Sequence, residues 1–175
     1  MRTITWHERL LRAEDGAATG SIGSGEDITD RLAAERRNNE LRALIEATAQ
    51  ASPDAILVTD IGGRYLFWNR RFQECWGLAD EYLELRRSGP RLTPELLQPI
   101  TSQLADPAAF FKFIERFYEA GAAPAQFNDL LLKDGRVLMT YAARVSVGNP
   151  PLAAVAWIYR DISEQKRRQA ELAQS

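Results

Sequence analysis

The stretch LAAVAWIYRDISEQKRRQA, residues 152–170, decides the fold. Its first half is a short apolar run with two aromatic residues, which predicts a β-strand. Its second half is rich in Glu, Gln, Lys and Arg and contains no Gly or Pro, which predicts a helix. Asp161-Ile162-Ser163 stands between the two halves, and Asp and Ser both cap helix starts well. We therefore expect a strand that passes directly into a helix.

Two more strands are predicted just before this one. AQFNDLLLK and RVLMTYAARVSV, residues 125–133 and 136–147, are separated by Asp134-Gly135, a two-residue hairpin turn. The second of them leads through the turn GNPP into the strand at residue 152. The middle strand is therefore expected to pair with both of its neighbours.

A hairpin and several helices are predicted further upstream. AILVTD and RYLFWN, residues 55–60 and 64–69, flank a glycine turn, and Asn69 is placed to cap a short helix that ends at Gly77. Residues 81–105 contain one Gly and three Pro, so only short helical pieces or loop are expected there. A longer helix is predicted from Pro107 to Gly121. Its apolar residues share one face: Phe110, Phe113, Ile114 and Phe117.

The tripeptide at residues 161–163 has a counterpart near the N-terminus. Asp27-Ile28-Thr29 aligns with it at an offset of 134 residues (161 − 27), and the same gap-free register places residues 2–12 on residues 136–146. Chance similarity between two hairpins is the alternative explanation. We interpret residues 1–29 as the last two strands of a preceding unit. Residues 30–50 are predicted to be a helical linker, which forms either a two-stranded coiled coil or a surface helix.

Composition narrows the classes of function. The chain has 175 residues, 22 basic and 24 acidic, with a net charge of −2, so we expect one globular domain with extensions and no extended nucleic-acid footprint. It has no apolar run long enough to span a membrane and no signal-peptide core, so we expect a cytoplasmic protein. A single Cys75 and a single His7 argue against a metal site and against Cys–His catalysis. We interpret Cys75 as a small buried hydrophobe, with redox sensing as the alternative.

The order of these elements resembles the PAS sensor family. The resemblance covers residues from about Leu44 to the C-terminus and rests on three motifs: GRYLFWNRRF (63–72), DGR (134–136) and WIYRDIS (157–163). It implies an α+β fold in which a five-stranded antiparallel sheet of order 2-1-5-4-3 carries short helices on one face, with flanking N- and C-terminal helices. It also implies four segments, which are residues 1–29 from a preceding PAS domain, the linker 30–50, the PAS domain 51–162, and the start of an output helix at 163–175.

Candidate site residues come partly from the pattern and partly from the resemblance. The resemblance places Asp161, Ile162 and Ser163 at the junction between sensor and output helix, with a plain helix cap as the alternative. A ligand pocket would be built from the aromatic residues of the last strand and the long helix with nearby polar groups, whereas simple core packing is the default explanation. The pocket candidates are Phe113, Phe117, Asn128, Tyr141, Trp157 and Tyr159, and Thr140 is a further polar candidate.

The function that the resemblance implies is regulatory. We expect a sensor and dimerisation module of a bacterial-type signalling protein, such as a histidine kinase or a diguanylate cyclase, which forms a homodimer through its flanking helices and has no catalysis of its own. No cofactor is predicted, because Cys75 does not lie in the motif of the flavin photosensors and the long helix has no histidine for haem. The alternatives are a ligand-free dimerisation and spacer module and a redox sensor that binds haem or flavin.

Overall fold

The computed structural model describes residues 2–119 and 123–173, without the side chains of Phe117, Gln126, Asn128 and Val147. The chain divides into two compact units, Met1–Thr48 and Ala49–Ser175. No helix within the described ranges is both long enough and apolar enough to cross a membrane.

The first unit is a hairpin followed by most of a long helix. β1 (Ile4–Arg12) pairs antiparallel with β2 (Ala18–Asp27), and α1 spans Thr29–Ala51. The hairpin and the helix predicted for residues 30–50 are both confirmed. None of residues 29–51, all of which the structure describes, is buried.

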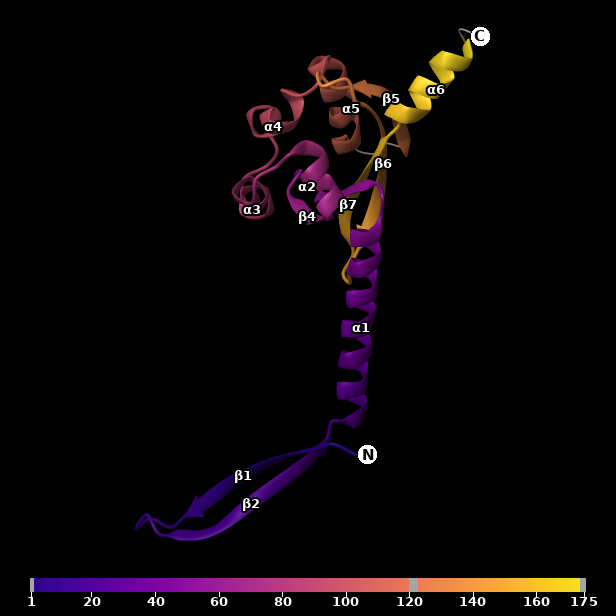
Figure 1. Ribbon diagram of the computed structural model, residues 1–175. Coiled ribbons are helices and arrows are strands. Elements are labelled where there is room, and N and C mark those ends of the chain that lie inside the picture. The colour runs from indigo at the N-terminus through magenta and orange to yellow at the C-terminus, as the bar shows by residue number, and fades with distance from the viewer. Residues whose placement is uncertain (1, 120–122, 174–175) are drawn as a thin grey trace. The chain divides into compact units, whose positions relative to one another are not determined.

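The second unit contains the predicted five-stranded sheet. Its strands are β3 (Ala55–Asp60), β4 (Tyr65–Trp68), β5 (Ala125–Leu131), β6 (Val137–Val147) and β7 (Leu152–Asp161). They pair antiparallel in the order β4-β3-β7-β6-β5 (Figure 1). Counted within this unit, that order is 2-1-5-4-3, so the expected topology is confirmed.

Helices form the other layer of this unit. They are α2 (Arg70–Trp76), α3 (Asp80–Ser88), the short 3-10 helix η1 (Glu95–Leu97), α4 (Gln98–Thr101) and α5 (Pro107–Tyr118), and α6 (Ser163–Ala173) follows the last strand. Gly77 ends α2 in the left-handed conformation, with φ 59°, as its position predicted. α5 ends at Tyr118, and the predicted end at Gly121 lies outside the described residues.

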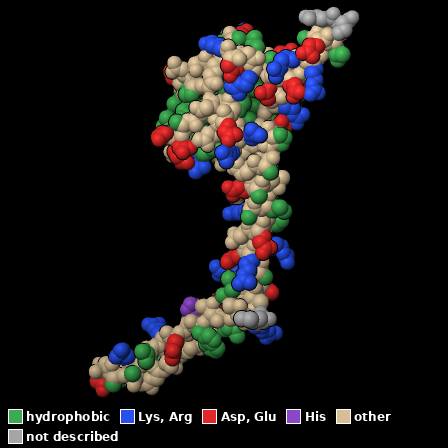
Figure 2. Space-filling model, viewed as in Figure 1, with side chains coloured by type: hydrophobic (Ala, Val, Ile, Leu, Met, Phe, Trp, Pro, Cys, Tyr) green, Lys and Arg blue, Asp and Glu red, His purple; other side chains and the backbone are tan. Residues whose placement is uncertain are grey.

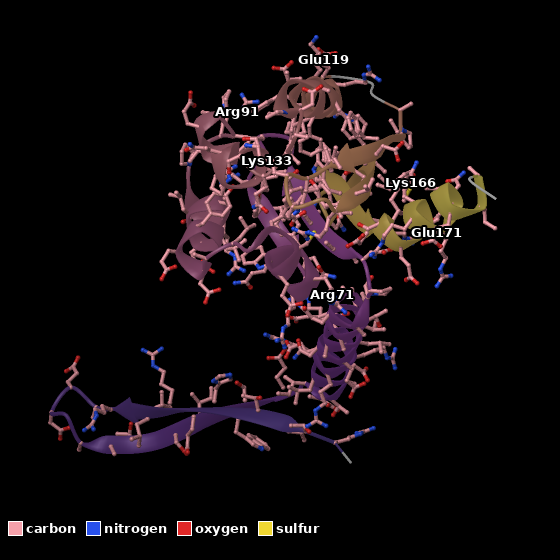
Figure 3. All side chains as sticks on the ribbon, turned by 45° about the horizontal axis from the view of Figure 1, so that its top comes forward. Arg71, Arg91, Glu119, Lys133, Lys166 and Glu171 are labelled. Carbon is pink, nitrogen blue, oxygen red and sulfur yellow. The ribbon has the colours of Figure 1, made fainter. Side chains whose placement is uncertain are left out.

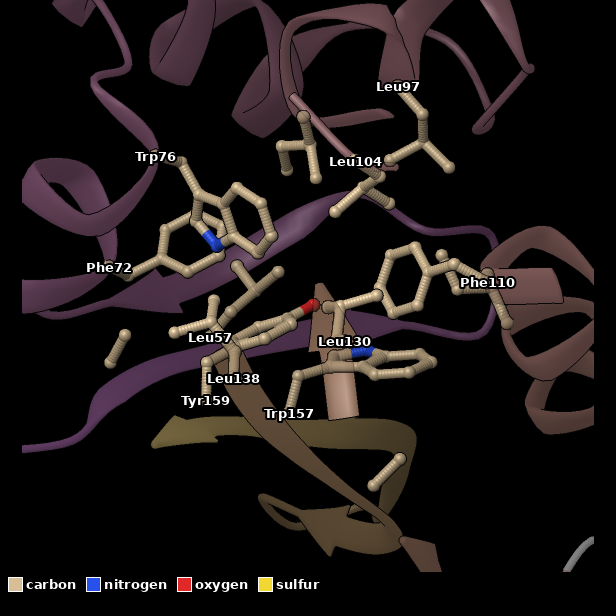
Figure 4. Packing of buried hydrophobic residues seen from close by; sticks show 14 of the residues in the cluster. Leu57, Phe72, Trp76, Leu97, Leu104, Phe110, Leu130, Leu138, Trp157 and Tyr159 are labelled. Atoms are coloured by element: carbon tan, nitrogen blue, oxygen red, sulfur yellow. The ribbon is translucent and has the colours of Figure 1, made fainter. Parts of the chain in front are cut away.

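The core lies between the sheet and the helices (Figure 4). Trp157 and Tyr159 of β7 are buried against aromatic residues of the helices, and Trp76 meets the ring of Tyr159 edge-on with 5.3 Å between the centroids. Burying a large apolar side chain contributes about 1.5–3 kcal/mol. These aromatic side chains therefore fix how the helices sit on the sheet.

Asn69 joins three elements of the second unit. Its side chain is fully buried, and its Oδ1 accepts hydrogen bonds from the N–H of Ile56 in β3 (2.9 Å) and of Phe72 in α2 (3.0 Å). Its Nδ2 donates to the carbonyls of Ala49 at the end of α1 and of Asp54 before β3, each at 2.9 Å. The predicted cap of α2 thus also holds the start of β3.

Candidate functional site

The interior between sheet and helices is almost filled. Its lining includes Trp157, Tyr159, Phe110 and Ile114, and the free volume is about 20 Å³. On this measure a single water needs roughly 10–15 Å³. The interior therefore has room for about one water molecule, and its aromatic residues act as core in this structure.

The structure sorts the predicted pocket residues into different places. Phe113, Trp157 and Tyr159 are buried, and the rings of Phe113 and Trp157 lie 6.3 Å apart. Tyr141 pairs with Ile158 and is 37% exposed, so it is not brought together with these buried residues. Its neighbour Thr140 faces the core instead. The side chains of the remaining candidates, Phe117 and Asn128, lie outside the described part of the chain.

A short polar network crosses this interior. Thr59 of β3 lies with its Oγ1 3.2 Å from the hydroxyl of Tyr118, and it accepts a hydrogen bond from Trp157 Nε1 at 3.3 Å. Burial raises the pKa of Tyr118 and, more strongly, that of Tyr159, because a phenolate is poorly solvated there. Both phenols are therefore neutral near pH 7, and that of Tyr118 acts as a hydrogen-bonding group toward Thr59.

An open cleft adjoins this network. A cleft of about 500 Å³ lies between α5, the β3–β4 turn and the segment before η1. Its apolar wall includes Leu92, Leu97, Phe111 and Ile114, and its polar residues include Arg91, Thr93, Glu115, Tyr118 and Glu119. Arg91 and Glu119, which are labelled in Figure 3, come from different elements of this cleft. Such a volume suits a small molecule with an apolar body and a polar or charged end.

None of the predicted pocket residues with a described side chain lines this cleft. Phe111, Glu115 and Tyr118 are spaced by four and three residues, so they form a second stripe on α5 beside the apolar face that was predicted. That spacing was the available signal. Arg91 had none, because it lies in a segment without a regular period.

One wall of the cleft depends on a close backbone contact. Gly63 has φ +81°, and a Cβ at this position would lie 2.5 Å from Cβ of Leu92. Leu92 N–H also donates to the carbonyl of Gly62 (2.9 Å). The fully buried Arg86 donates from Nη2 to the carbonyl of Gly63 (2.6 Å) and from Nη1 to that of Pro90 (3.3 Å). The guanidinium therefore ties α3 to both sides of this contact.

The predicted signal-transfer residues form a compact junction. Asp161 Oδ1 accepts hydrogen bonds from the N–H and the hydroxyl of Ser163, at 2.9 and 2.5 Å. Ser163 Oγ accepts from the N–H of Val137 at 2.9 Å, and Ile162 N–H donates to the carbonyl of Val137 at 2.9 Å. The start of α6 is therefore bound to β6 as well as to β7.

Cys75 lies close to this junction. It is half-buried, and it shares a hollow of about 230 Å³ with Arg136 and Asp161. Arg136 Nη1 donates to the carbonyl of Cys75 at 2.9 Å. Burial raises the pKa of the thiol, and the nearby guanidinium opposes that rise only in part. Among the described residues no cluster of His, Cys, Asp and Glu could hold a metal ion.

Charge is mixed over the surface. Figure 2 shows basic and acidic side chains interspersed on the viewed face of each unit. Several are paired, for example Arg160 with Asp54 at 2.7 Å and Lys166 with Asp129 at 2.6 Å.

Comparisons with a family model and with solved structures both found similarity to PAS domains. The family described as "PAS domain" matches residues 40–111. Among solved structures, the PAS domain of an HTR-like protein from Haloarcula marismortui is 20% identical with a TM-score of 0.51, and the match covers 75% of this chain and 99% of that one. The PAS domain of Bordetella pertussis BvgS is 18% identical with a TM-score of 0.50, covering 77% and 98%. No curated protein matches this sequence significantly.

Proposed function

We propose that residues 51–162 form a regulatory sensor that passes a ligand- or partner-dependent change through Asp161-Ile162-Ser163 to the output helix that begins at residue 163, and the match of the family described as "PAS domain" to residues 40–111 supports this. The observation that supports this most directly is the junction itself. Four hydrogen bonds bind the first turn of α6 to Asp161 and to the start of β6, so a shift of either strand alters the capping of the helix.

The ligand is expected in the open cleft rather than in the filled interior. A molecule bound there contacts Tyr118, whose hydroxyl meets Thr59, and Thr59 in turn accepts from Trp157. Trp157 lies in β7, the strand that ends at Asp161. This row of contacts gives a physical route from cleft to junction.

Native mass spectrometry of the purified chain, followed by a thermal-shift screen of small metabolites, tests the proposal. A ligand that binds is then measured on Arg91→Ala, which should weaken binding at least ten-fold, and on Arg116→Ala, which should not. Arg116 is the matched control because it lies on α5 but does not line the cleft. Equal affinities for the two variants would place the ligand elsewhere, and no bound ligand at all would contradict sensing.

A dimerisation and spacer module is the second candidate. Two observations favour it: the interior is filled, and α1 exposes Leu41, Leu44 and Ile45. In this case two copies of α1 would pair along those residues. The domain would then set the rotational phase of one neighbouring helix relative to the other. Sedimentation of the wild-type chain, Ile45→Ser and the control Glu46→Ser tests it. The expected result is a dimer that only the Ile45 variant dissociates.

A cofactor-bound redox sensor is a third candidate and has a simple test. Flavin or haem gives purified protein a visible absorbance, so a colourless preparation argues against both.

A further inference from the structure

The cleft between α5 and the segment before η1 has a charged mouth and an apolar floor. Arg91, Glu115 and Glu119 line the cleft and are exposed, and we call these three residues its rim. Leu97 and Ile114 also line the cleft, each only 6% exposed, and they belong to its floor. A molecule that fits both regions keeps its charged groups at the mouth and directs an apolar group inward.

Rim charges of opposite sign come from opposite walls of the cleft. Arg91 lies in the segment between α3 and η1. Glu115 lies in the last turn of α5, and Glu119 follows that helix directly. The carboxyl end of a helix also carries a partial negative charge. The α5 wall therefore attracts a cation, and the wall that carries Arg91 attracts an anion.

The three rim charges have no ionic partner within the part of the chain that the structure describes. The ion pairs found there do not include Arg91, Glu115 or Glu119. The adjoining turn does pair its charges, with Arg64 Nε 2.8 Å from Asp60 Oδ2. Unpaired charges are ordinary on an open surface, but these surround a cavity of about 500 Å³. They are therefore placed to meet the charged groups of a ligand.

The floor adds an apolar surface below these charges. Leu92 and Phe111 widen it, and both are half-buried side chains that pack against the core. An empty cleft leaves this surface in contact with water. An apolar group seated on the floor removes its own surface and that of the floor from water, which is favourable. The floor therefore favours a ligand with a branched or aromatic hydrocarbon group.

We propose that the ligand of this cleft is a free α-amino acid with a large apolar side chain, such as phenylalanine or leucine. Its carboxylate meets Arg91, its ammonium group meets Glu115 and Glu119, and its side chain lies on Leu97 and Ile114. This rests on the proposed function of the cleft as the ligand site of a sensor, and it names the class of molecule that is sensed.

Other simple classes of ligand leave part of the cleft unmatched. An anion is repelled by Glu115 and Glu119, and an amine leaves Arg91 without a partner. A polar amino acid leaves the floor in contact with water. An α-amino acid carries its carboxylate, its ammonium group and its side chain on one carbon atom. It therefore supplies two opposite charges at the mouth and one apolar group below them.

Isothermal titration of the full chain with L-phenylalanine tests the assignment. Phenethylamine is the same molecule without the carboxylate, and hydrocinnamate is the same molecule without the ammonium group. Each should bind at least about ten-fold more weakly than phenylalanine, because each loses a charge-assisted contact. L-Serine keeps both charges and lacks the apolar group, so it should also bind at least about ten-fold more weakly. Equal affinities for phenylalanine and hydrocinnamate would overturn the proposal.

Variants of the rim assign each charge to its wall. In Arg91→Ala the carboxylate has no partner, so phenethylamine should bind within about two-fold of phenylalanine. In Glu115→Gln the preference for phenylalanine over hydrocinnamate should fall from about ten-fold to about three-fold, because Glu119 remains. The matched controls are Arg116→Ala and Glu81→Gln, which change exposed residues that do not line the cleft and should keep the wild-type preferences. Wild-type preferences in both rim variants would overturn the proposal.

Failure of this assignment can be told apart from failure of the proposed function. Suppose that apolar amino acids do not bind, while another metabolite binds and Arg91→Ala weakens it. The cleft is then a ligand site of a different chemical class, so only this assignment is overturned. If no metabolite of any class binds to the wild-type chain, ligand sensing itself is contradicted.

Discussion

Gly63→Ala tests the contact that shapes the cleft. At φ +81° an alanine is strained by about 1 kcal/mol. Its Cβ would also lie 2.5 Å from Cβ of Leu92, a distance that side chains do not tolerate, so the segment before η1 must move. Overpacking of this kind costs about 1–3 kcal/mol. The expected loss in the free energy of unfolding is therefore about 2–4 kcal/mol.

Gly135→Ala is the matched control. Gly135 has φ +90°, and no heavy atom of the described residues lies within 4 Å of the position its Cβ would take, so only the conformational strain of about 1 kcal/mol applies. Urea unfolding of both variants, followed by tryptophan fluorescence, measures the difference. Because the clash is at Cβ of Leu92, adding Leu92→Ala should not restore Gly63→Ala, whereas Leu92→Gly should restore part of it. Equal losses for the two glycine variants would refute the reasoning.

Three further predictions concern single side chains. Burial alone would raise the pKa of Asp60, but the hydrogen bonds that its carboxylate accepts outweigh burial and lower the pKa. The contribution of Asp60 to the free energy of unfolding is therefore present above about pH 4 and is lost on acidification. Asp60→Asn should flatten the fall of the urea midpoint below about pH 4. Arg86→Met leaves two carbonyls without a donor and should cost about 2–3 kcal/mol in urea unfolding, against less than about 1 kcal/mol for the exposed Arg87→Met. Burial raises the pKa of Cys75, so a thiol reagent at pH 8 should react about ten-fold faster with the unfolded chain.

The fold was predictable because its signals are local. Asp134-Gly135 predicts a hairpin, and Asn69 and Gly77 predict the two ends of α2. The hairpin and the helix were both found at these positions. The order of the strands needed more than local signals, and it came from the resemblance. α5 ends at Tyr118, where Glu119 turns to an extended conformation with ψ 147°, and the predicted end at Gly121 lies outside the described residues.

The candidate site was less predictable, since it depends on register and volume. Tyr141 and Thr140 are adjacent, and only the pairing of β6 with β7 decides which one faces the core. Whether aromatic side chains enclose a cavity or fill it depends on packing to within a methyl group, which residue types do not specify. The cleft could not be predicted either, because its opposite walls come from segments that are far apart in the chain.

A filled interior changes how a domain of this kind could respond to a ligand. An empty pocket lets a ligand act directly on the sheet, whereas here the core between Trp157, Tyr159 and α5 has room for about one water. Tightly packed cores do not deform gradually, so a displacement at their edge is passed on rather than absorbed. A ligand in the cleft would move α5 and Tyr118, and with them Thr59 and β7. Under the proposed function, the dense core that favours a spacer would thus also let a ligand in the surface cleft act on the junction at the far end of the strand.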